Sequence, residues 1–338
     1  MEMLNSMSQI DEMVIAEFAN LPNGLSYLEK TTKLLDKYKD ILRQFSLRDD
    51  NSISIYDEED LKIVVDKYLK DIKKLIESYS RGKLIEGNRI TNRLFGITAN
   101  RSTAEAYFPK IKIPKNCFWF RSRTPELDKV MGRKDLFHVP FEKRSKVGAN
   151  RYSIPGYPCL YLASTMEYAR EETGNKPISA ISCFKNDIDI EVYDFSFYSK
   201  AEMSRKYLFN AIKSYPFKIV SSIPVNSSDE SFKYMEEFII PQLILHCAIK
   251  QRGISPKVYG LIYSSTKAIQ QSLPSEAFSK HLNLVIPTFF VPNVGHCRFL
   301  KLHFPMTKPE IVPFGYLKDN QLNQIEEEMK YKKFICLK

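Results

Sequence analysis

The chain changes character near residue 111, and this change constrains its fold more than any other feature. Before that point an apolar stripe with a spacing near 3.6 residues runs from Leu61 to Tyr79, which is typical of a helix. After it, short apolar runs separated by turn residues alternate irregularly with helical segments. The pattern predicts an α+β protein with short strands and surrounding helices, preceded by an N-terminal helical region.

The expected elements are short. Helices are expected over residues 25–45, 61–81, 165–173, 199–214, 230–250 and 318–338. Strands are expected over residues 116–120, 159–162, 178–184, 188–195, 258–263 and 284–290. A chain of 338 residues can form one large domain or two. Glycines at positions 82, 87 and 96 mark the best junction, so we expect a helical region over 1–110, a core domain over 111–300 and an extension over 301–338.

The basic excess lies entirely in the second part of the chain. Residues 1–110 carry 17 Lys and Arg against 18 Asp and Glu, whereas the whole chain carries 50 against 40. A local basic excess favours an anionic ligand, either a phosphate-bearing small molecule or a nucleic acid. A basic surface that serves solubility is the alternative.

Cysteine usage and hydropathy indicate the compartment. The six cysteines are scattered without a CxxC pair, as expected for buried thiols in a reducing cytoplasm. No apolar run approaches eighteen residues, and the N-terminus lacks a signal-peptide pattern. We therefore expect a cytoplasmic protein that does not bind membranes.

Residues 151–172 combine more local signals than any other stretch. PGYP at residues 155–158 is a turn, and residues 159–162 form a short apolar strand. Ser164 and Glu167 have the spacing of a capping box, which predicts that a helix begins near the following residue.

The end of this helix breaks a local rule. Gly174 predicts where the helix stops, so Glu171 and Glu172 fall in its last turn. The helix dipole disfavours negative charge there. Local conflicts of this kind collect at functional sites, although a glutamate pair is also common on a solvated helix face.

Two further stretches place groups suited to anions at strand ends. Arg121 follows the aromatic run at residues 118–120, and a guanidinium pairs bidentately with phosphate. The strand near 259–263 runs into three hydroxyl residues at 264–266. Such hydroxyls usually cap a helix N-terminus, which can also hold a phosphate.

Histidine and cysteine give no argument for a metal site. His246-Cys247 and His296-Cys297 are dipeptides, and neighbouring residues on a strand point in opposite directions. No glycine-rich nucleotide-binding motif occurs in the sequence. We therefore expect these residues to be structural and the protein to bind no metal.

Taken in order, these stretches resemble the RES domain, a family named after an arginine, a glutamate and a serine. The resemblance is carried by Phe120-Arg121, LFHVPFEKR at 136–144, RYSIPGYPCLYLAS at 151–164, Glu171-Glu172 and GLIYSS at 260–265. It covers residues 117–290, and the segment 151–172 is its most specific part. The first 110 residues and the tail after 290 are extra to the minimal family pattern.

The resemblance implies a set of site residues. The family's functional positions fall on Arg121, Arg151, Tyr161, Glu172 and Ser265. The register leaves Glu171 open beside Glu172, and Ser264 open beside Ser265.

The resemblance also implies a fold and an activity. It implies an ADP-ribosyltransferase-like core with short strands in a split sheet. Family members are typically toxins of bacterial toxin–antitoxin pairs that consume NAD+ by hydrolysis or phosphorolysis. The expected enzyme is therefore an NAD+ glycohydrolase or phosphorylase, with NAD+ as substrate, inorganic phosphate as a candidate acceptor and a protein antitoxin as partner.

Two alternatives remain at this stage. One is ADP-ribosylation of a protein or nucleic-acid target. The other is a non-catalytic nucleic-acid-binding protein that uses the basic second part. Against the latter, the aromatic residues lie in apolar strands and form no RNA-binding signature, so contact with nucleic acid is expected only through a partner.

The implied residues suit the implied chemistry. Cleavage of the nicotinamide–ribose bond builds positive charge on the ribose, which the carboxylate of Glu172 would stabilise. Arg121 and Arg151 would hold the pyrophosphate, Tyr161 would stack on nicotinamide or ribose, and Ser265 would orient ribose or phosphate. Nicotinamide leaves as a neutral group, so the reaction requires no metal.

Overall fold

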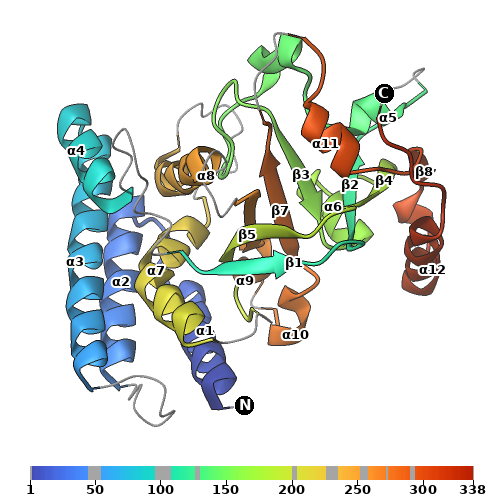
Figure 1. Ribbon diagram of the computed structural model, residues 1–338. Coiled ribbons are helices and arrows are strands. Elements are labelled where there is room, and N and C mark those ends of the chain that lie inside the picture. Colours follow the sequence, from blue (N-terminus) through green and yellow to red (C-terminus); the bar gives the residue numbers. More distant parts are fainter. Residues whose placement is uncertain are drawn as a thin grey trace.

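The computed structural model describes residues 2–44, 55–95, 108–125, 130–199, 204–225, 235–251, 258–271, 273–289 and 294–337. It confirms the α+β class: a mixed sheet packs against helices, and a helical region precedes it in the chain (Figure 1). None of the described helices is long and apolar enough to cross a membrane.

The described part of the N-terminal region contains the helices α1 (Glu2–Ala19), α2 (Tyr27–Gln44), α3 (Ile55–Ser80) and α4 (Leu84–Phe95). The expected helices at 25–45 and 61–81 are confirmed as α2 and α3. α4 runs through Gly87, within the glycine-containing stretch that the sequence offered as a junction. A Cβ at Gly87 would lie 3.0 Å from the Tyr79 ring, so the glycine permits close packing of α4 on α3. Gly96 lies outside the described residues.

The sheet has eight strands, which are β1 (Lys110–Ile113), β2 (Phe118–Arg123), β3 (Cys159–Ala163), β4 (Ser179–Lys185), β5 (Ile190–Phe195), β6 (Gly260–Ser264), β7 (Leu282–Pro287) and β8 (Glu310–Val312). Their order is β1-β5-β6-β7-β3-β2-β4-β8, and the β5–β6 pair is parallel while the other neighbours are antiparallel. All six expected strands are present, and β1 and β8 were not predicted as separate strands.

The sheet is split between β2 and β3. β2 pairs with β4 along its whole length, from Phe118 to Arg123. β2 pairs with β3 only where Phe120 faces Ala163. The two halves of the sheet therefore diverge on either side of this contact, as a split sheet requires.

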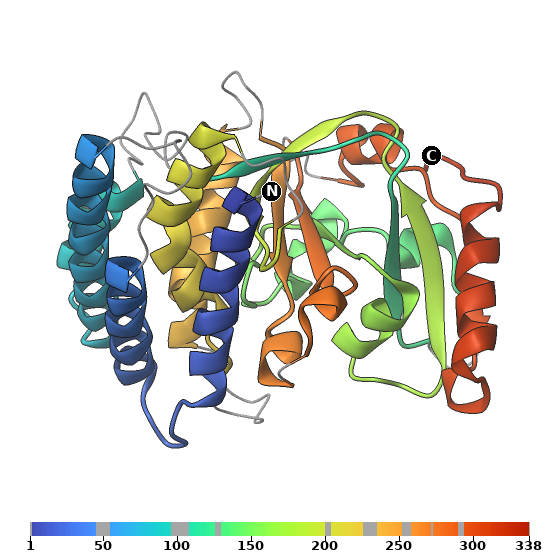
Figure 2. The same cartoon turned by 90° about the horizontal axis from the view of Figure 1, so that it is seen from below.

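The remaining helices are α5 (Arg133–Leu136), η2 (Phe141–Lys146), α6 (Met166–Glu172), α7 (Arg205–Ser222), η3 (Glu236–Phe238), α8 (Ile239–Gln251), α9 (Thr266–Gln270), α10 (Ser275–Phe278), α11 (Arg298–His303), η4 (Phe314–Tyr316) and α12 (Asp319–Lys330). Figure 2 shows α2 and α3 as an outer layer, with α7 and α8 between them and the sheet. α12 lies at the opposite end of the molecule, near β4.

One apolar cluster joins the N-terminal helices to the sheet. It includes Leu35 and Ile76 of the N-terminal helices, Phe217 of α7, and Tyr193 and Val285 of the sheet. The helical region is therefore packed into the same core as the strands that it precedes.

The start of α6 differs from the sequence expectation. Thr165, rather than Ser164, is the N-cap, and its hydroxyl accepts the N–H of Tyr168. The Ser164 hydroxyl is committed elsewhere, because it donates to Lys280 O at 2.8 Å and accepts the N–H of Leu282 at 3.1 Å. The expectation that Glu171 and Glu172 end this helix is confirmed.

Candidate active site

A cavity of about 470 Å³ opens at the split in the sheet. Residues of β2, β3, α6, β6 and β7 line it, together with the loop at 150–152. Four of the five residues singled out in the sequence lie on its wall: Arg121, Arg151, Tyr161 and Glu172. The fifth, Ser265, is buried directly behind Glu172, and its hydroxyl donates to Glu172 Oε1 at 3.5 Å.

The geometry separates both pairs that the sequence left open. Glu172 lines the cavity, whereas Glu171 turns to His281, with 3.7 Å between Glu171 Oε2 and His281 Nε2. Ser265 contacts Glu172 and caps α9 by accepting the N–H of Lys267 at 3.1 Å. Ser264 points to the other side, where its hydroxyl accepts the N–H of Phe197 at 2.9 Å.

Arg121 fills the split itself. The N–H of Ser164 donates to Leu282 O of β7. Backbone groups of successive residues on β3 point alternately to its two neighbouring strands, so those of Tyr161, three residues earlier, point to β2. β2 has already diverged at this point, and Arg121 Nη1 donates to the Tyr161 carbonyl at 2.8 Å instead. The guanidinium thus replaces a backbone bond that the split removes.

The charge of Arg121 is poorly compensated by the protein. Burial, and then the like charge of Arg123, lower the pKa of Arg121 to about 9. Its Nε finds no hydrogen-bond partner among the described residues. Within the same residues no carboxylate lies within ion-pair distance of Arg121, so an anion in the cavity would supply what the fold does not.

Arg151 reaches the cavity from the loop before β3. Its Nη1 donates to Ser221 O at 2.6 Å and its Nη2 to Ile223 O at 2.9 Å, which are carbonyls at the C-terminal end of α7. Its guanidinium carbon lies 5.8 Å from the centre of the Phe238 ring. A guanidinium has five N–H donors, so donors remain for a ligand after these two bonds.

Tyrosines form much of the wall near these cations. The Tyr161 hydroxyl donates to Tyr152 O at 2.8 Å, which fixes the ring against the cavity. The rings of Tyr152 and Tyr263 lie with their centres 4.3 Å apart. Burial raises the pKa of Tyr161 and of Tyr263 well above the ordinary value, so both hydroxyls stay neutral.

Glu172 is exposed at the C-terminal end of α6, and polar groups surround its approach to the cavity. After burial itself, the negative charge of Glu172 is the largest cause that raises the pKa of Tyr168 and of Tyr263. The side-chain amide of Asn283 donates to the Tyr168 hydroxyl. Glu172 therefore lies within a ring of hydroxyl and amide groups that can orient a sugar.

The sequence analysis missed Tyr263 and Asn283. They face each other across β6 and β7, and Ala163 of β3 faces Asn283 from the other side. Tyr263 belongs to the GLIYSS stretch, where its position two residues before Ser265 was the available signal. For Asn283 no local signal existed, because its place depends on the register of three strands.

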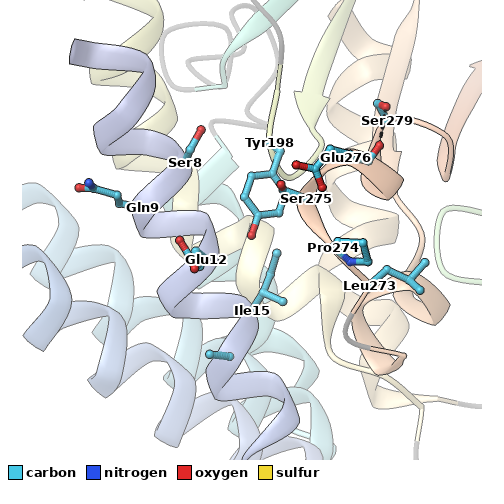
Figure 3. A pocket seen from close by; sticks show the side chains of 11 residues that line it. Ser8, Gln9, Glu12, Ile15, Tyr198, Leu273, Pro274, Ser275, Glu276 and Ser279 are labelled. Carbon is cyan, nitrogen blue, oxygen red and sulfur yellow. Dashed lines mark hydrogen bonds between the residues drawn. The ribbon is translucent and has the colours of Figure 1, made fainter. Parts of the chain in front are cut away.

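A second hollow of about 780 Å³ lies between α1 and α10 (Figure 3). Glu12 approaches it from α1 and Glu276 from α10, with Tyr198 between them (Figure 3). Among the residues that the structure describes, its lining includes these two carboxylates and no lysine or arginine. The carboxylates disfavour an anionic ligand, although the hollow is larger than the cavity at the split.

His138 and Cys297 are hydrogen-bonded to each other and to the surrounding backbone. His138 Nδ1 donates to Val139 O at 2.8 Å, and its Nε2 accepts the N–H of Cys297 at 2.9 Å. Burial lowers the pKa of His138 to about 3, so the ring stays neutral. Across the described ranges, no three His, Cys, Asp or Glu side chains are grouped to hold a metal ion, and the six cysteines form no disulfide.

No family model and no solved structure matches the chain. A curated relative does: the Bacillus subtilis (strain 168) protein described as "Putative toxin YopC" is 30% identical over 265 residues. The alignment covers 72% of this chain and 58% of that protein. This chain therefore spans less than two thirds of the length of its relative, and the similarity extends well beyond the cavity alone.

Proposed function

We propose that the chain binds NAD+ in the cavity at the split and cleaves its nicotinamide–ribose bond. One observation carries the proposal: a single cavity combines the guanidinium groups of Arg121 and Arg151 with the carboxylate of Glu172. The volume of about 470 Å³ is within the range of small-molecule sites. The resemblance of the lining residues to the RES domain supports the same activity.

The proposed step needs positioning and fixed charge. The guanidinium groups would bind the pyrophosphate, and the bond from ribose C1 to the nicotinamide nitrogen would break with its electron pair leaving on nicotinamide. Glu172 would stabilise the positive charge that develops on the ribose, with its carboxylate oriented by Ser265. Attack by water gives ADP-ribose and a released proton, whereas attack by phosphate gives the 1-phosphate of ADP-ribose.

The neighbouring glutamates provide a matched pair of variants. Glu172→Gln keeps the shape and removes the charge, so nicotinamide release should fall about 100-fold or more, as for loss of one charge-stabilising group. Glu171→Gln removes the same charge one residue away, where the side chain faces His281, and should retain near wild-type turnover. Release is measured with and without phosphate. A wild-type protein that releases no nicotinamide under either condition contradicts the proposal.

We further propose that this activity makes the protein a toxin. The support is the printed name of the Bacillus subtilis relative. Expression of the wild type should arrest growth and lower cellular NAD+, and expression of Glu172→Gln should do neither. Transfer of labelled ADP-ribose to cellular protein or nucleic acid would instead favour the ADP-ribosyltransferase alternative. A neutralising protein antitoxin is the partner that this function predicts.

A further inference from the structure

α7 lacks donors for several of its own carbonyls. Pro216 lies inside the helix, and because proline has no N–H, the carbonyl of Ile212 four residues earlier loses its partner. The carbonyls of the last turn also have no partner within the helix. Groups outside α7 must therefore satisfy both places.

The N-terminal helices supply donors at both places. The Tyr38 hydroxyl of α2 donates to Ile212 O at 2.9 Å, which is the carbonyl left open by Pro216. The Tyr27 hydroxyl of the same helix donates to Val220 O at 3.1 Å, in the last turn. Asp11 of α1 also binds α7, where Lys218 Nζ donates to it at 2.8 Å.

Carbonyls just beyond Val220 O bind Arg151, which lines the cavity. Arg151 donates hydrogen bonds to Ser221 O and Ile223 O, so Tyr27 and Arg151 bind neighbouring carbonyls at the C-terminal end of α7. The two groups also affect each other electrostatically, since the charge of Arg151 opposes the rise that burial causes in the pKa of Tyr27. Burial lowers the pKa of Arg151 and of Lys30 on α2, and the carboxylate of Glu237 opposes the shift in both, so one anion acts on both groups.

We propose that Tyr27 is a positioning residue for Arg151, and this inference rests on the function proposed above. By binding Val220 O, Tyr27 leaves Arg151 bound to Ser221 O and Ile223 O, with its other donors directed to the cavity. Without the Tyr27 hydroxyl, the buried Val220 carbonyl loses this donor beside the two carbonyls that hold Arg151, and it would compete for the guanidinium. The N-terminal helical region thereby sets the affinity of the cavity for the pyrophosphate of NAD+.

Helix α2 provides the variant and its control. Tyr27→Phe removes the hydroxyl that binds Val220 O and should raise KM for NAD+ by about fivefold to tenfold, with kcat changed less than twofold, since the net contribution of one neutral hydrogen bond is of this order. Tyr38→Phe removes an equivalent hydroxyl bond to the same helix, but two turns away from Arg151. It should lower the melting temperature and leave KM unchanged.

The outcomes separate this inference from the proposed function. Nicotinamide release by the wild type with equal KM for Tyr27→Phe and wild type overturns the inference alone. An equal rise of KM in both variants also overturns it, because general destabilisation then explains the effect. Absence of release by the wild type overturns both proposals.

A measurement on the wild type covers the case in which Tyr27→Phe does not fold. ADP-ribose bound to Arg151 should slow amide hydrogen exchange at residues 217–223, the end of α7 that the guanidinium holds. Unchanged exchange there, with ADP-ribose bound, would contradict the coupling.

Discussion

Arg121 shows most directly how single residues are held ready for a ligand. Its guanidinium is half-buried, bonds a backbone carbonyl across the split and has no carboxylate within ion-pair distance among the residues described. An uncompensated cation costs free energy of folding. Such a cost is typical of a site where a ligand supplies the missing charge.

Replacement of Arg121 by lysine should therefore weaken ligand binding even though the charge is kept. Lysine cannot reproduce the planar donor fork, so the dissociation constant for ADP-ribose should rise about tenfold or more. Isothermal titration calorimetry measures this directly. Arg123→Lys is the control, because Arg123 lies two residues along β2 and does not line the cavity. Equal affinities for Arg121→Lys and wild type would exclude Arg121 as a ligand-binding group.

The sequence identified the two arginines, one tyrosine and one glutamate of the lining, but it could not orient them. Glu171 and Glu172 are chemically identical, and only the rotation of α6 sends one to His281 and the other to the cavity. Tyr263 and Asn283 were missed for a related reason. These two residues are brought together by the register of β6 and β7, which the local sequence around either residue does not determine.

At the scale of elements, α6 is anchored at its N-terminal end by α12. Its N-terminal N–H at Met166 donates to Glu326 Oε2 of α12 at 2.7 Å, and its last residue is Glu172. The helix that carries the proposed catalytic carboxylate is therefore fixed by the C-terminal extension. Burial raises the pKa of Glu326 above its ordinary value of 4.5, against the opposing effects of Met166 N–H and Lys330.

The pH dependence of stability should reveal this contact. Because the folded state binds the Glu326 proton more tightly than the unfolded state, this group stabilises the fold below pH 4.5, and the contribution is lost as pH rises through the folded pKa. Glu326→Gln keeps an oxygen acceptor for Met166 and removes the titration. The free energy of unfolding of the variant relative to wild type should therefore increase between acid and neutral pH, as urea denaturation would measure. A difference independent of pH would contradict the assignment.

Element positions were more predictable than their ends. Apolar runs placed the six expected strands because a short buried strand needs little more than such a run. The sequence assigned the cap of α6 to Ser164, but the cap is Thr165. The Ser164 hydroxyl is not available as a cap because it bonds the backbone of Lys280 and Leu282, more than a hundred residues later in the chain. Contacts between residues so far apart in the chain cannot be predicted from the local sequence.

At the scale of the molecule, the N-terminal helices and the sheet share one apolar core. Leu35 and Ile76 are completely buried, as are Phe217 and Val220 of the intervening α7 at 1% exposure or less. The division at residue 110 that the sequence suggested stays a prediction, but the packing makes the two parts interdependent.

Removal of residues 1–110 should therefore prevent cooperative folding of the remainder. The truncation exposes the apolar face of α7 and leaves the carbonyls of Ile212 and Val220 without their tyrosine donors. The shortened chain should lack a sharp thermal transition in circular dichroism and should bind a hydrophobic dye. A cooperative transition close to that of the full chain would instead establish residues 111–338 as an independent domain.

The single residue pair between β2 and β3 has a mechanical consequence for any molecule that binds beside it. Backbone hydrogen bonds fasten the rest of the sheet, but at this seam only Phe120 and Ala163 do so. A dinucleotide bound by Arg121 on the β2 side and by Arg151 and Tyr161 on the β3 side would connect the two halves of the sheet. Ligand binding would then restrict the motion of the two halves of the sheet relative to each other.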